Sequence, residues 1–165
     1  MNEIAYMIDN LEKTPLFLSF LLDQIPEDRL KEQRQTGKWS IHEQVCHLAE
    51  AQEILRDRFI QFDKEINPFI ISYEAPIDRP YDYYLKLSLK GKIKRFQLLR
   101  KEMLTMLRNF DESYWEKEGR HTVFSPYSSK LLLMHTLNVD HVHLFSIEQL
   151  GLAKEELKDG IITLP

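Results

Sequence analysis

The sequence predicts an all-α fold, an up-down four-helix bundle that forms a single domain over residues 1–165. Four long segments carry apolar residues at spacings of three and four, the period of a helix with one buried side. No two segments alternate polar and apolar residues in the way that paired strands do. With 165 residues, of which 43% are hydrophobic and 29% charged, the chain is long enough to bury one core.

The first predicted helix covers residues 2–24 and closes before Pro26. Pro15 lies inside this apolar pattern. Because proline lacks an amide hydrogen and crowds the preceding turn, we expect a kink or a restart there, with Thr14 as a cap.

The second predicted helix begins at a capping box, in which the Ser40 hydroxyl and the Glu43 carboxylate satisfy amides of the first turn. Its apolar stripe continues to about Asp63. The next stretch, residues 67–80, contains three prolines and suits neither a long helix nor a central strand. We expect a long structured loop there, which either crosses the end of the bundle or covers a pocket.

The third predicted helix runs from residue 81 or 82 to Phe110, because one internal glycine, Gly91, costs only about 1 kcal/mol. The fourth runs from residue 127 or 128 to Leu150, with Gly151 as its C-terminal stop. Basic residues interleaved with apolar ones in the third helix are interpreted as its solvated side: Lys90, Lys92, Lys94, Arg95 and Arg100.

Charge and composition exclude several classes of function. The formal net charge is −4 and no basic block is present, so we expect no nucleic-acid partner. The longest apolar run, residues 16–22, is too short to span a bilayer, and the N-terminus resembles no secretion signal, so we expect a cytoplasmic protein. Cys46 is the only cysteine, and we interpret it as a flanking residue of the core rather than a catalytic thiol.

Six histidines are candidates for metal or proton chemistry, and helical phase sorts five of them. On the second helix, His47 lies at the edge of the core and His42 is expected on the surface. On the fourth helix, His135 and His143 face inward while His141 faces outward. His135 and His143 are about 12 Å apart along the helix axis, so they cannot share one ion.

Val139 occupies the position halfway between the two inward histidines, where a third imidazole would complete a pair with either neighbour. His143 can meet His47 across the bundle and share a metal with it, whereas His135 is interpreted as a core histidine with its own hydrogen-bond partner. Asp140 either orients the His143 ring or faces water.

Two motifs resemble signatures of the DinB-like family. Residues 39–48, WSIHEQVCHL, are similar to the family pattern W-S-x-x-E-x-x-x-H-L, and residues 140–150, DHVHLFSIEQL, to its closing H-D-x-x-H-L-x-Q-I motif. Residues 115–121 resemble the lead-in to the second motif, so the resemblance covers nearly the whole chain. It implies an up-down four-helix bundle, often a homodimer, with one histidine of the second helix and two of the fourth around zinc or nickel.

Carried over to this chain, the resemblance implies an incomplete metal site. His47 matches the first ligand and His143 the last, while the middle ligand falls on Val139 and the usual glutamine of the last motif on Ser146. Two imidazoles alone hold a metal weakly, since a catalytic zinc normally has three protein ligands.

A third ligand could come from Glu50, one turn after His47, although helical phase turns it away from the stripe, or from His121 in a loop. Arg58 lies on the same stripe as His47 and is a candidate to bind an anionic thiol cofactor, the alternative being an ion pair or a surface role.

Members of the family include S-transferases that use bacillithiol, mycothiol or glutathione, and a maleylpyruvate isomerase. The resemblance therefore implies a divalent-metal-dependent thiol S-transferase, with a small thiol and an electrophile as partners. The substitution at the middle ligand favours a different function, that of a metal-free protein that binds a small molecule or interacts with a partner. A hydrolase that activates water with the same ion is a third alternative.

Overall fold

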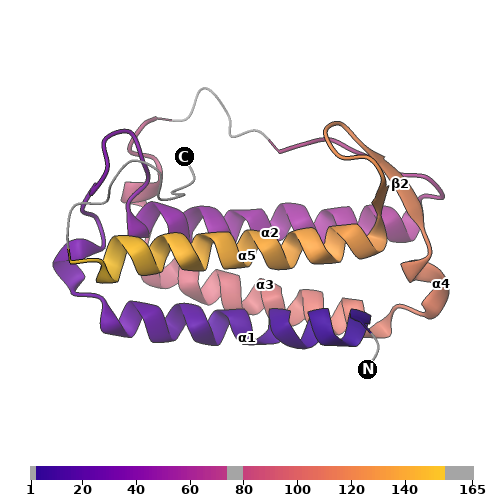
Figure 1. Cartoon of the computed structure of the whole chain (residues 1–165), viewed down its shortest axis with the longest axis horizontal. Helices are drawn as coiled ribbons and strands as arrows, with labels where there is room; N and C mark the ends of the chain where they lie inside the picture. Colours follow the sequence, from indigo (N-terminus) through magenta and orange to yellow (C-terminus); the bar gives the residue numbers. More distant parts are fainter. Residues whose placement is uncertain (1–2, 74–79, 155–165) are drawn as a thin grey trace.

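A computed structural model describes residues 3–73 and 80–154 of the chain. The predicted four-helix bundle is confirmed (Figure 1). Its helices are α1 (Glu3–Gln24), α2 (Ile41–Lys64), α3 (Leu89–Asn109) and α5 (Ser129–Leu152). Helices α1 and α2 each pack against α3 and α5, so α1 and α2 lie diagonally across the bundle. None of the described helices is both long enough and apolar enough to cross a membrane.

Helices α2 and α3 run in the same direction, opposite to α1 and α5 (Figure 1). The expected up-down alternation is therefore wrong between α2 and α3, which follow each other in the chain but are parallel. At one end, His42 near the start of α2 hydrogen-bonds to the carbonyls of Tyr84 and Leu87, just before α3. At the other end, Tyr114 in the short helix α4 (Glu112–Trp115) donates a hydrogen bond to the Phe59 carbonyl of α2. The long connection between α2 and α3 returns the chain to the end from which α2 began.

Helix α1 continues through Pro15, so the expected restart is wrong. Proline cannot donate to the carbonyl four residues earlier, which belongs to Leu11. Arg100 Nη1 on α3 donates to this carbonyl at 2.9 Å. Thr14 Oγ1 lies 3.1 Å from the same carbonyl, but its one proton is donated to the Asp140 carboxylate. Thr14 is therefore no helix cap, and the backbone acceptor that proline leaves open is satisfied by the Arg100 side chain.

The predicted capping box of α2 is confirmed, with Ser40 accepting from the Glu43 amide. Helix α3 begins later than predicted, because Ser88 caps it and the preceding turn is a separate 3-10 helix, η2 (Tyr84–Lys86). A second 3-10 helix, η1 (Glu27–Arg29), follows α1.

Gly151 does not stop the fourth helix, which ends at Leu152. The glycine lies inside α5 and is buried, where an added Cβ would come within 2.3 Å of the Ile25 side chain. Its role is therefore to allow close packing of α5 against the chain that follows α1.

Three short strands form a small sheet in the order β1, β2, β3, so the expectation of no strand pairing is wrong. β1 (Phe69–Ile70) pairs in parallel with β2 (Glu118–His121), which pairs antiparallel with β3 (Tyr127–Ser128). β1 lies within the stretch expected to be a loop, of which residues 74–79 are outside the described residues. The sheet packs closely on α2 because position 119 is glycine: a Cβ there would lie 2.8 Å from the Phe62 ring.

An ion pair lies buried at the centre of the bundle. Arg100 is 1% exposed, and its Nη1 and Nη2 donate to the two carboxylate oxygens of Asp140 at 2.6 and 2.9 Å. Thr14 and Gln52 also donate to this carboxylate, so all four long helices meet in the network. Arg100 is thus not on the solvated side of α3, and Asp140 neither orients His143 nor faces water.

Candidate functional site

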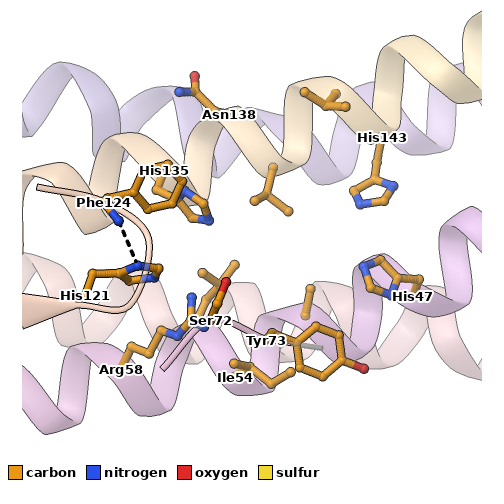
Figure 2. A pocket seen from close by; sticks show the side chains of 14 residues that line it. His47, Ile54, Arg58, Ser72, Tyr73, His121, Phe124, His135, Asn138 and His143 are labelled. Carbon is orange, nitrogen blue, oxygen red and sulfur yellow. Dashed lines mark hydrogen bonds between the residues drawn. The ribbon is translucent and has the colours of Figure 1, made fainter. Parts of the chain in front are cut away.

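A pocket of about 400 Å³ lies between α2 and α5 and is bordered by the end of β2 (Figure 2). Polar side chains gather at its two ends, with His47 and His143 at one and Arg58, His121 and His135 at the other. The wall between the two ends is mainly apolar, formed by Ala51, Ile54, Leu55, Val139 and Val142.

His47 on α2 and His143 on α5 face each other across the pocket (Figure 2), with ring centroids 5.1 Å apart and ring planes inclined by 48°. His143 is 2% exposed, and its Nδ1 lies 2.6 Å from Gln44 Oε1. With the amide oxygen as acceptor, the proton is on Nδ1 and Nε2 carries the lone pair. Burial, with a smaller effect of His47, lowers the pKa of His143 to about 3, so the ring is neutral.

The orientation of His47 depends on a chain of hydrogen bonds that ends in a carboxylate. The Tyr84 hydroxyl donates to Glu50 Oε2 at 3.2 Å, so it accepts from His47 Nδ1, which lies 3.3 Å away. In the neutral imidazole this leaves the lone pair on Nε2. Glu50 also accepts from Lys92 Nζ at 3.1 Å. Glu50 therefore acts on His47 through Tyr84 and is not placed as a further metal ligand.

The geometry of the two imidazoles fits part of a metal site. When two imidazoles bind one tetrahedral ion through nitrogens at about 2 Å, their ring centroids are about 5.2 Å apart. The observed separation of 5.1 Å matches this value. No group of three His, Cys, Asp or Glu side chains is arranged to hold a metal within residues 3–73 and 80–154. His47 and His143 thus offer two donors, and Val139 leaves the third position without a protein ligand.

At the opposite end, Arg58 is 9% exposed, and its Nη2 donates to the Ile71 carbonyl at 2.7 Å. No Asp or Glu forms a salt bridge with Arg58 in the part of the chain that the structure describes. Burial lowers the pKa of its guanidinium. The charged group is thus shielded from water, and no carboxylate among the described residues compensates for this. The alternatives of an ion pair or a surface role are therefore wrong for the described residues.

Two histidines complete this end of the pocket, and helical phase alone did not place them there. His121, the last residue of β2, accepts hydrogen bonds at Nδ1 from the amides of Val123 and Phe124, at 3.0 and 3.2 Å, so its proton is on Nε2. His135 is half-buried, contacts the Phe124 ring, and makes no hydrogen bond to a described residue. The interpretation of His135 as a core histidine with its own partner is thus wrong.

Two further residues near the site have structural roles. His42 is 3% exposed rather than on the surface, and its Nε2 lies 3.0 and 3.1 Å from the carbonyls of Tyr84 and Leu87. It therefore fixes the segment that carries the Tyr84 hydroxyl. Cys46 is fully buried, and burial raises the pKa of its thiol to about 11, so it is no nucleophile at neutral pH. His141 is exposed, as predicted.

The fold and the pocket define a four-helix-bundle protein with a histidine-lined pocket, and comparison with known proteins gives its family. The sequence model that defines the DinB superfamily matches residues 10–144, so the chain belongs to this superfamily. Among solved structures it is similar to YfiT from Bacillus subtilis, described as a probable metal-dependent hydrolase with an unusual four-helix bundle topology. The identity is 19% and the TM-score 0.76, over 91% of this chain and 87% of YfiT. No curated protein matches the sequence.

Proposed function

We propose that this protein is a thiol S-transferase of the DinB superfamily in which His47 and His143 supply two ligands of a divalent cation, zinc or nickel. The observation that carries the proposal is the pair of imidazoles whose separation of 5.1 Å matches two ligands of one ion. The thiol substrate itself supplies the donor that Val139 does not.

A divalent cation bound there would lower the pKa of a coordinated thiol, so that a thiolate is present at neutral pH to attack an electrophile. The protein's own residues prepare the site. Gln44 and Tyr84 hydrogen-bond to the Nδ1 atoms of the two histidines, which orients the rings. The apolar wall of the pocket reduces the access of water to the thiolate.

A second candidate function is that of a metal-free protein that binds a small molecule in the same pocket. It is favoured by Val139, which puts an isopropyl group at the third ligand position, and by the lack of another arranged ligand among the described residues. A hydrolase, the activity suggested for YfiT, would use the same two histidines to hold an ion that activates water rather than a thiol.

Titration of zinc into tag-free protein by calorimetry, after elemental analysis of the protein as purified, tests the metal. We expect wild type to bind zinc and His143→Ala to bind it at least tenfold more weakly. The control is His141→Ala, which removes an exposed imidazole two residues away on the same helix. If neither the wild type nor the control binds zinc, the metal-free function is the better description.

Incubation with candidate thiols and a chromogenic electrophile then separates the two enzymatic functions. Formation of the thioether that depends on both added metal and His143 supports the transferase. Metal-dependent ester or amide cleavage without thioether formation would instead support the hydrolase.

A further inference from the structure

We propose that Arg58, His121 and His135 form a carboxylate-binding subsite, so that the natural ligand is an elongated molecule with a carboxylate at the end remote from His47 and His143. The inference deepens the proposed function by naming the substrate class, and it rests on that function only for the reactive end of the ligand. Figure 2 shows the two sets of side chains at opposite ends of one pocket.

Two buried arginines of the bundle differ in whether a carboxylate lies beside them. Arg100 is 1% exposed and has the carboxylate of Asp140 at 2.6 Å. Arg58 is 9% exposed, and among the described residues its guanidinium has only the Ile71 carbonyl as a hydrogen-bond acceptor. Because a buried cation without a counter-charge is costly, and because this one lines an open pocket, a ligand anion is the missing partner.

Two histidines beside Arg58 offer further hydrogen-bonding groups. The Nδ1 atom of His121 accepts two backbone amides, so its Nε2 is a donor, and His135 lines the pocket without a hydrogen bond to any described residue. Both histidines thus have unused hydrogen-bonding capacity at this end of the pocket.

The charge of the subsite selects a carboxylate over a phosphate dianion. Burial, together with the charge of Arg58, lowers the pKa values of His121 and His135 below the ordinary value for histidine, so both rings are neutral at neutral pH. The subsite therefore has one positive charge and neutral donors, which complement a monoanion. The apolar wall beyond it, including Ile54 and Val142, suits an alkyl or aromatic body.

The probes are octanoate and octan-1-ol, two eight-carbon chains that end in a carboxylate and in a neutral hydroxyl, respectively. Both are titrated into chelator-treated, metal-free protein by calorimetry. We expect wild type to bind octanoate at least tenfold more tightly than octanol. Arg58→Gln should lose this preference and bind octanol as wild type does, while His135→Leu should weaken octanoate binding several-fold. The control is Arg56→Gln, because this partly exposed arginine pairs with Asp57 and with Glu102 of α3 and does not line the pocket.

Equal binding of both probes to wild type, no octanoate binding at millimolar concentration, or a preference that persists in folded Arg58→Gln would each overturn the subsite. Tighter binding of octyl phosphate than of octanoate would overturn the assignment to a carboxylate. If Arg58→Gln does not fold, an unchanged octanoate affinity of His135→Leu is decisive against the subsite.

The two proposals fail separately because the probes are measured without metal. An octanoate preference that depends on Arg58, in a protein without zinc affinity, supports the subsite and contradicts the metal site. Zinc binding that depends on His143, in a protein that binds octanoate and octanol equally, supports the metal site and contradicts the subsite.

Discussion

Replacement of Asp140 by alanine should be strongly destabilising. The carboxylate accepts two hydrogen bonds from Arg100, at 2.6 and 2.9 Å, and the two side chains are 0% and 1% exposed. Truncation leaves a buried guanidinium without its counter-charge, a change that typically costs about 3–5 kcal/mol. For a domain of this length, this corresponds to a fall in the melting temperature of roughly 10 °C.

Urea unfolding followed by far-ultraviolet circular dichroism measures the effect. The control is Asp57→Ala, which removes a carboxylate from an exposed pair with Arg56 and should cost less than about 1 kcal/mol. The double variant Arg100→Met/Asp140→Leu should recover much of the loss, because the pair is then replaced by apolar side chains. If Asp140→Ala has the same unfolding free energy as Asp57→Ala, the reasoning about the buried charge is wrong.

Three further predictions concern the pocket and its surroundings. Val139→His should raise zinc affinity at least tenfold by adding the third imidazole, and unchanged affinity by calorimetry would mean that His47 and His143 do not direct their Nε2 atoms at one ion. Tyr127→Phe should leave the unfolding free energy unchanged or raise it by up to about 1 kcal/mol, since its buried hydroxyl lacks a partner among the described residues; a clear loss in urea unfolding would contradict this. Burial lowers the pKa of His42 in the folded state, so stability that is present above about pH 6.5 is lost as the pH falls below this value. Between neutral pH and about pH 5, the urea midpoint of His42→Gln should therefore fall less than that of the wild type.

Most helix boundaries follow from local signals, and the errors arise where a partner comes from far along the chain. The capping box of Ser40 and Glu43 lies within four consecutive residues, so the start of α2 was predictable. At Pro15 the same local reasoning failed, because the Leu11 carbonyl is satisfied by Arg100, 89 residues away. The strands were missed because each spans only two to four residues, too few to display alternation.

The candidate site was predictable where helical phase and the family motif agree, as they do for His47 and His143. Phase gives the direction of a side chain but not what it meets. It therefore could not show that Asp140 pairs with Arg100, or that an inward histidine such as His135 borders a cavity. His121 lies in a strand at the end of a connection, where no period fixes its direction.

Both ends of the pocket are anchored on one continuous helix, since His135 and His143 belong to α5. Their separation of eight residues, about 12 Å at 1.5 Å per residue, cannot vary without breaking backbone hydrogen bonds. Helix α5 therefore holds the two ends of the pocket at a constant distance from each other. For the carboxylate ligand proposed above, this constant distance predicts chain-length selectivity: a short acid would occupy only one end of the pocket, whereas a homologue of the right length would contact both.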